Sequence, residues 1–224
     1  MRRYIASDFH NGNEVADYDR VMGFLELVET DADELLLVGD FEEMLWSNLT
    51  ILETVPPYSY VTDKVRQIAA KKPAKIILGN HDWNLGLFAS QIEPIQIVSP
   101  FAEDGVYYCH GSEFDWLSVV TGTPVDPIYW KSPFPFLFPT QLLLWLATRV
   151  WAKSEDTYGL GVALIHEGAR AYAEKNGHHT VVLGHTHYPT VEIRGGVGLY
   201  NTGDMMGSYS YLVQENGIIE LKYF

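Results

Sequence analysis

Thiols are almost absent from this chain of 224 residues, which contains a single cysteine, Cys109. One cysteine cannot form an intrachain disulfide, and so few thiols exclude a structural zinc cage. We interpret Cys109 as a small buried residue on a strand rather than as a nucleophile. Residues 141–151 are apolar but too few to span a bilayer, and no signal-peptide core follows the N-terminus. We expect a cytoplasmic protein.

Basic residues are also scarce, with 15 lysines and arginines against 29 acidic residues and a formal net charge of -14. This balance argues against a broad nucleic-acid surface, and no stable nucleic-acid partner is expected. Most of the acidic excess is typical of a soluble surface. If the substrate is anionic, bound metal ions must supply much of the positive charge that it requires.

Side chains suited to metal binding are concentrated in five short motifs. In order they are Asp8-Phe9-His10, Gly39-Asp40, Gly79-Asn80-His81-Asp82, His110-Gly111 and Gly184-His185-Thr186-His187. Each motif follows an apolar run typical of a buried strand, at residues 4–7, 34–38, 75–78, 106–109 and 180–183. Because the carboxyl ends of strands form the ligand-binding crevice of an open α/β sheet, we expect the motifs to converge there.

The residue types in these motifs predict a pair of divalent ions. Two ions about 3.5 to 4 Å apart need a bridging carboxylate, with imidazoles and neutral oxygens in the other positions, and Asp40 is the natural bridge. Asp8 and His10 are two residues apart, as are His185 and His187. In an extended segment that spacing presents both side chains on one face. Imidazole combined with carboxylate suits manganese, iron or zinc.

The order of these motifs resembles the calcineurin-like metallophosphoesterase superfamily from residue 8 to residue 187, with a further family-like segment at Asn201-Thr202-Gly203-Asp204. A single motif of this kind occurs by chance, but the complete ordered set is specific. The resemblance implies an α/β fold, a four-layer α/β/β/α sandwich of two mixed sheets with a helical cap insertion. We expect a single domain at residues 1–224, with the insertion at about residues 114–175.

The same resemblance assigns four protein ligands to each metal ion. One ion is held by Asp8, His10, Asp40 and His187, and the other by Asp40, Asn80, His110 and His185. We predict two Mn²⁺ ions, with iron, zinc or magnesium as alternatives. His81 is left to protonate or hydrogen-bond the departing oxygen, and Asp82 to orient it. The implied reaction is in-line attack of metal-activated water on phosphorus.

The remaining chain predicts the other elements of the sandwich. Helices are expected at residues 14–30 and 59–71, each with an apolar stripe facing a sheet. Four strands at residues 190–194, 197–201, 209–213 and 218–223, joined by glycine-rich turns, are expected to form a second sheet packed on the first. Glu42 and Glu43 are interpreted as capping or solvating the turn after Asp40.

The segment from residue 114 to residue 153 is far more aromatic than the rest of the chain, and a helix is expected to begin near Thr140. It fits acyl chains of a substrate, peripheral membrane contact, a homodimer interface, or a helical subdomain that fills its own core. Lys131, Arg149 and Lys153 are candidates for holding phosphate oxygens, the alternative being that they are solvated cations.

Within the superfamily, Gly39-Asp40-Phe41-Glu42, Trp46 and the insertion most resemble the UDP-2,3-diacylglucosamine diphosphatases, although those enzymes commonly carry arginine at the position of His81. We therefore predict a dinuclear phosphoesterase that hydrolyses a phosphodiester or diphosphate bond, with a nucleotide-linked lipid as the specific candidate. One alternative is a general or nucleotide phosphodiesterase without a lipid role. The other is a non-enzymatic protein-binding scaffold, which the complete ligand set disfavours.

Overall fold

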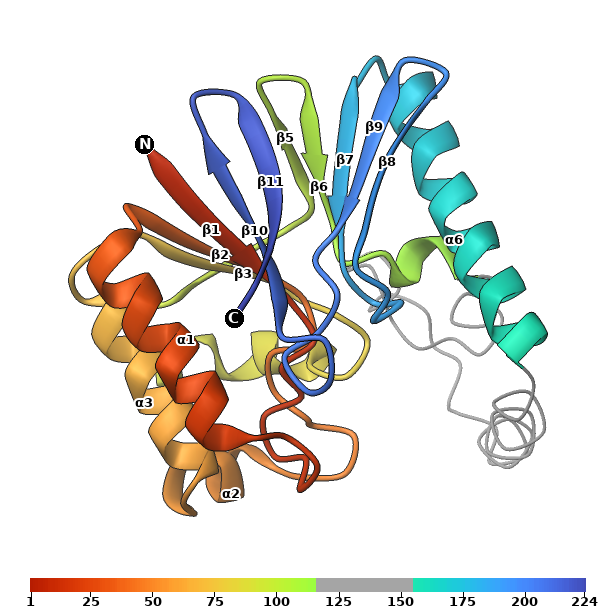
Figure 1. The fold of residues 1–224 in the computed structure, drawn as a ribbon. Helices are drawn as coiled ribbons and strands as arrows, with labels where there is room; N and C mark the ends of the chain where they lie inside the picture. The colour runs from red at the N-terminus through yellow and green to blue at the C-terminus, as the bar shows by residue number, and fades with distance from the viewer. Residues whose placement is uncertain (116–154) are drawn as a thin grey trace.

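Two mixed β-sheets pack face to face in the computed structural model, which describes residues 1–115 and 155–224, with side chains from residue 159 in the second range (Figure 1). Ile5 and Leu36 of one sheet and Val182 of the other are fully buried in a shared apolar cluster between them. Helices cover the outer faces of both sheets. The predicted α/β sandwich of two mixed sheets is confirmed.

The first sheet contains six strands. Their order is β11 (Ile218–Tyr223), β10 (Ser210–Glu215), β1 (Arg2–Ala6), β2 (Glu34–Val38), β3 (Ala74–Ile77) and β4 (Gln96–Val98). Strands β1 to β4 are parallel, whereas β10 is antiparallel to β1 and β11. The parallel strands therefore end at one common edge of the sheet.

The second sheet contains five strands, and it departs from the sequence prediction. Their order is β5 (Phe101–Glu103), β6 (Val106–Tyr108), β7 (Thr180–Leu183), β9 (Val197–Asn201) and β8 (Thr190–Arg194). Only two of the four C-terminal strands belong here, because β10 and β11 extend the first sheet. Leu212 of β10 packs between the sheets, whereas Tyr211 and Val213 pack toward α1. Because β10 has apolar side chains on both faces, it needs a position in a sheet where both faces are covered.

Helices α1 (Tyr18–Asp31), α2 (Leu49–Thr54) and α3 (Tyr58–Ala69) lie on the side of the first sheet, and α6 (Glu155–Lys175) covers the second (Figure 1). Helix α1 begins four residues later than predicted, because the Asp17 side chain caps it by accepting from Arg20 N at 3.1 Å. Two short 3₁₀ segments, Trp83–Gln91 and Ser112–Phe114, follow the third and fourth motifs.

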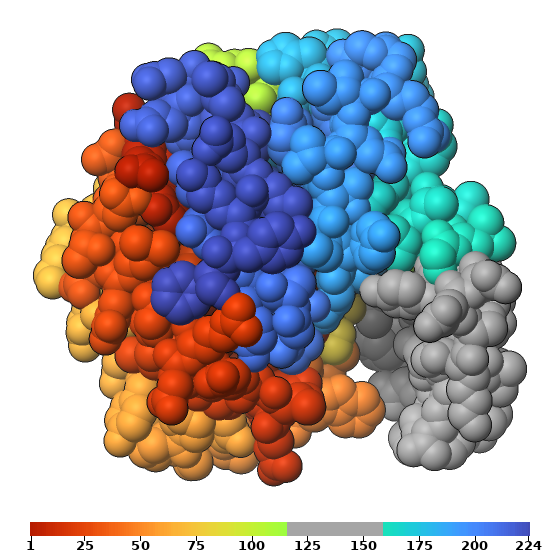
Figure 2. Space-filling model, in the orientation of Figure 1, coloured from red at the N-terminus to blue at the C-terminus, as the bar shows by residue number. Residues whose placement is uncertain are grey.

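Cys109 is completely buried in an apolar cluster beneath α6, as expected for a structural residue. Burial raises the pKa of its thiol well above the ordinary value, which leaves it a poor nucleophile. The residues after 180, drawn in blue, cover much of the face shown in Figure 2, where strands β8 to β11 form a large part of the surface.

Several predictions fall outside the residues that the structure describes. They are the helix expected near residue 140, most of the aromatic segment, and the candidate phosphate contacts Lys131, Arg149 and Lys153. Within the described part of the chain, no helix combines the length and apolar character needed to cross a membrane.

Candidate dinuclear metal site

The five motifs meet at one end of the sandwich, and both sheets contribute to the site. The first three motifs follow the carboxyl ends of β1, β2 and β3, and the other two follow β6 and β7. Because these strands are parallel within each sheet, the loops that follow them emerge on the same side. Residues far apart in the sequence thus become neighbours.

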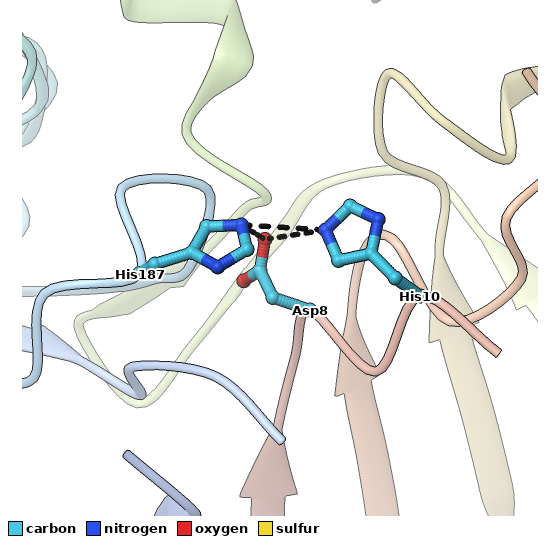
Figure 3. A group of neighbouring side chains, drawn as sticks. All are labelled: Asp8, His10 and His187. Atoms are coloured by element: carbon cyan, nitrogen blue, oxygen red, sulfur yellow. Dashed lines mark hydrogen bonds and ion pairs between the residues drawn. The ribbon is translucent and has the colours of Figure 1, made fainter. Parts of the chain in front are cut away.

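Asp8, His10 and His187 form the first group of candidate ligands (Figure 3). His187 Nε2 lies 3.3 Å and His10 Nε2 3.8 Å from Asp8 Oδ1, and the two ring nitrogens are 3.3 Å apart. Asp8 Oδ1 is buried and receives no hydrogen bond among the described residues. Two imidazole nitrogens and an orphaned carboxylate oxygen directed at one point fit a divalent metal ion.

Asp40, His110 and His185 form the second group. His110 Nε2 lies 3.2 Å from Asp40 Oδ2 and 3.2 Å from Asn80 Oδ1, so the amide of Asn80 joins this group. Asp40 Oδ2 also lies 3.8 Å from His10 Nε2 of the first group. A carboxylate placed between the two groups is suited to bridge two ions.

The backbone at the ligands differs from the extended segments expected from their spacing. Five candidate ligands have φ between 44° and 65°, in the left-handed region: Asp8, His10, Asp40, His185 and His187. This conformation costs roughly 1 kcal/mol or more at each non-glycine residue. It turns the chain sharply where each strand ends, and such strain is concentrated at functional sites.

Three motif glycines are required by close packing around the ligands. A Cβ atom at Gly39, Gly79 or Gly184 would lie 2.1 Å from a side-chain atom of His110, Asp40 or Ser7, respectively. Contacts this short do not occur between real atoms, so the loops can approach one another only without a side chain at these positions. The glycines in the motifs therefore have a steric explanation.

Carboxylates orient both histidines of the first group from behind. Glu43 Oε2 lies 3.0 Å from His10 Nδ1, and Asp204 Oδ2 lies 3.2 Å from His187 Nδ1. If each Nδ1 carries the proton, Nε2 is free to face a metal ion. Asp204 belongs to the family-like segment singled out in the sequence, whereas nothing in the sequence indicated the contact between Glu43 and His10.

In the second group, one backbone carbonyl and one carboxylate orient the two histidine rings. The backbone oxygen of Val38 lies 2.8 Å from His110 Nδ1, and Asp115 Oδ2 lies 3.3 Å from His185 Nε2. These contacts fix the orientation of both rings. The contact with Asp115 was not foreseen, because nothing in the sequence singled out this residue.

The electrostatic balance of the site favours bound cations. Burial opposes charge on these side chains, yet the surrounding carboxylates raise the pKa of His10, His110 and His187 to about 10 in the absence of metal. Burial likewise opposes a low pKa for Asp8, but the neighbouring histidines hold it well below its ordinary value. In the metal-free protein the protonated histidines neutralise the carboxylates, and a divalent ion must displace the protons of these histidines.

His81 lies beside the first group, and its contacts differ from those expected. Its Nδ1 is 2.8 Å from Glu43 Oε2, the same carboxylate that contacts His10. Asp82 is completely buried and accepts hydrogen bonds from Gly79 N at 2.7 Å and Phe41 N at 2.8 Å. Glu43 therefore orients the His81 ring, whereas Asp82 ties two ligand loops together.

Glu42 was expected to cap or solvate a turn, but it is completely buried. Its carboxyl oxygens accept hydrogen bonds from Thr62 Oγ1 at 2.8 Å and Asn11 Nδ2 at 2.9 Å. Burial raises the pKa of Glu42 to about 8 in spite of these contacts. Burial therefore favours the neutral form of this side chain.

This raised pKa predicts that the stability of the metal-free protein falls as the pH rises from about 4.5 to about 8. The folded state keeps a proton that the unfolded chain releases in this range, which gives a slope of about 1 kcal/mol per pH unit. Glu42→Gln should remove this contribution, while Glu220→Gln at an exposed position should leave it unchanged. Urea unfolding of chelator-treated protein at pH 5 and pH 8 measures the slopes. Identical slopes in wild type and Glu42→Gln would contradict the prediction.

The family model of the calcineurin-like phosphoesterases matches residues 1–189 of this chain. This range includes all five motifs and most of both sheets. The chain belongs to the calcineurin-like phosphoesterase family. No match was found among curated proteins.

Several solved structures are similar to this chain. Yfce, a phosphoesterase from E. coli, is 19% identical, with 100% of this chain and 93% of that chain covered and a TM-score of 0.49. An archaeal phosphodiesterase is 12% identical, with both chains covered completely and a TM-score of 0.52. Vps29 from Entamoeba histolytica, solved in complex with zinc, is 13% identical, with 99% and 97% covered and a TM-score of 0.45. At these identities the likeness concerns the fold alone.

Proposed function

We propose that this protein hydrolyses a phosphodiester or diphosphate bond with the aid of two divalent metal ions. The observation that carries the proposal is the position of Asp40 between two groups of candidate ligands, each with two histidines. The family of the chain, a phosphoesterase family, supports the same chemistry. Bound at these residues, two divalent ions would lower the pKa of water and neutralise phosphoryl oxygens.

The protein's own residues would position the ions and handle the leaving group. Glu43 holds His81 by Nδ1 at 2.8 Å, which leaves Nε2 on the opposite edge of the ring. About a quarter of the His81 side chain is exposed, so a bound substrate can reach it. We assign to His81 Nε2 the donation of a hydrogen bond or a proton to the departing oxygen.

We further propose Mn²⁺ as the metal and a nucleotide-linked lipid, such as UDP-2,3-diacylglucosamine, as the substrate. Leu45 and Trp46 lie two and three residues after Glu43 in the chain, and they are 43% and 83% exposed. Large apolar side chains exposed beside a metal site offer a surface to an acyl chain. A general or nucleotide phosphodiesterase is the second candidate. A diester carries little negative charge, and this favours it as the substrate of a site rich in carboxylates.

Product analysis tests both candidates. Manganese-loaded protein is incubated with UDP-2,3-diacylglucosamine or with a soluble diester, and the products are identified by mass spectrometry, with Asp40→Asn as the control. Release of UMP and the lipid monophosphate supports the lipid substrate. Cleavage of the soluble diester alone supports the general phosphodiesterase. Protein that binds no metal after loading would instead support a scaffold.

His81→Ala should retain its metal ions but lose activity selectively on substrates with poor leaving groups. General acid catalysis contributes about 10²- to 10⁴-fold, and a good leaving group such as nitrophenolate needs little of it. We expect a loss in this range for an alkyl diester and a much smaller loss for a nitrophenyl diester. Comparison of kcat for both diesters, with the metal content measured in parallel, tests this role. Equal losses on the two substrates would refute it.

A further inference from the structure

Strand β8 is an exposed edge of the second sheet. It pairs with β9 on one side, and no strand of the described residues pairs with its other side. Its five residues, Thr190–Arg194, contain no proline or lysine, and they run in unbroken register with β9. Proteins usually protect such edges, because the free backbone groups can pair with another strand.

The two faces of β8 have different chemistry. Glu192 and Arg194 are directed toward α6, where Arg170 Nη2 lies 2.8 Å from Glu192 and Glu167 lies 3.4 Å from Arg194. Val191 and Ile193 alternate with them and therefore lie on the opposite face, toward the first sheet.

The apolar face of β8 is only partly covered. Val191 is in register with Tyr200, which packs on the cluster between the sheets. Nevertheless, Val191 is 45% exposed and Ile193 is 75% exposed. Apolar side chains at the rim of the inter-sheet core thus lie beside an unpaired strand edge.

We propose that β8 pairs in antiparallel orientation with β8 of a second copy of this chain, around a two-fold axis at Ile193. The two second sheets would then join into one continuous sheet. A two-fold interface uses the same surface of both copies, so the strand must be complementary to itself. The sequence of β8 meets this requirement.

Self-complementarity selects the register. With the axis at Ile193, Glu192 of each copy lies opposite Arg194 of the other, on the same face of the sheet. An axis at Glu192 would place two carboxylates opposite each other. A shift by one residue would place Glu192 opposite Ile193 and so bring a charged side chain to the apolar face.

Charges already present in each chain extend this pairing. Across the interface, Glu167 and Arg194 of one copy would meet Glu192 and Arg170 of the other in a row of alternating sign. Exposed pairs contribute little affinity, so they mainly fix the register. Main-chain hydrogen bonds along residues 192–194 and the covering of Ile193 supply the affinity.

The oligomeric state of the full-length protein tests the proposal. We expect a dimer in sedimentation velocity for wild type and a monomer for Ile193→Lys, because two like charges would meet on the axis. Ile218→Lys is the matched control, since Ile218 is 64% exposed on β11, the edge of the other sheet. Circular dichroism verifies that the variants are folded. A monomeric wild type, or dissociation by Ile218→Lys instead, would overturn the proposal.

Cysteine crosslinking tests the register separately. In Ile193→Cys, the thiols of the two chains would face each other across the axis, so mild oxidation should give a covalent dimer. In Val191→Cys the two thiols would be about 13 Å apart along the strands, beyond the reach of a disulfide. The native Cys109 is buried and does not compete. A covalent dimer from Val191→Cys, or from neither variant, overturns the register at Ile193.

Discussion

Asp40→Asn should lower kcat/KM on the order of 10³-fold and leave fewer than two metal ions bound. The reason is the position of Asp40 Oδ2, which lies 3.2 Å from His110 Nε2 and 3.8 Å from His10 Nε2, between the two groups of ligands. A bound metal contributes several kcal/mol of transition-state stabilisation, and each 1.4 kcal/mol corresponds to a tenfold change in rate. Asparagine keeps the shape but removes the charge that two bound cations would share.

Metal content and kinetics of the same preparation measure this effect. Both proteins are loaded with manganese and freed of excess metal, and their metal content is measured by elemental mass spectrometry. Asp63→Asn serves as the control, because Asp63 is a 56% exposed carboxylate on α3, distant in sequence from every motif. Asp40→Asn with two ions and an unchanged rate would show that Asp40 does not bridge the ions.

Gly184→Ala should disrupt the site by sterics alone. A Cβ atom at residue 184 would lie 2.1 Å from Ser7 Oγ and 2.5 Å from Asp8 Oδ2. Because both neighbours are buried and Asp8 is a candidate ligand, the loops that carry the candidate ligands must separate. We expect a loss of stability of about 1 to 3 kcal/mol, the usual cost of overpacking, and weaker metal binding.

Gly161→Ala is the matched control, since in the described part of the chain a Cβ at this position in helix α6 meets no atom within 4 Å other than its own helix backbone and chain neighbours. Alanine there should be neutral or stabilise the helix by up to about 1 kcal/mol. Urea unfolding of metal-free protein gives the stability, and titration calorimetry with Mn²⁺ gives the metal affinity. Unchanged stability and affinity in Gly184→Ala would mean that the loops at residues 7–8 and 184 are not closely packed.

Local patterns were sufficient to locate most of the elements that position the site. Strands at residues 34–38 and 180–183 have the predicted bounds, and the stripe of Val21, Phe24 and Leu25 is buried as expected. The prediction that β10 and β11 belong to the second sheet was wrong, since they extend the first sheet. Alternation of apolar and polar residues identifies a strand but not the strand with which it pairs.

The loops that carry the ligands were less accessible to sequence analysis. Residue spacing brought Asp8 and His10 into one site, but it did not reveal their left-handed backbone, which the packing of several loops imposes. The contact of Glu43 with both His10 and His81 depends on the path of the loop after Asp40. No short-range pattern encodes that path.

The left-handed backbone at five ligands also bears on how this site could be lost in evolution. Together these residues cost on the order of 5 kcal/mol, most of which glycine would recover at the same positions. Selection for stability alone would therefore favour glycine over the histidines and aspartates. A chain that replaced these side chains by glycine would therefore gain stability at the cost of its candidate metal site.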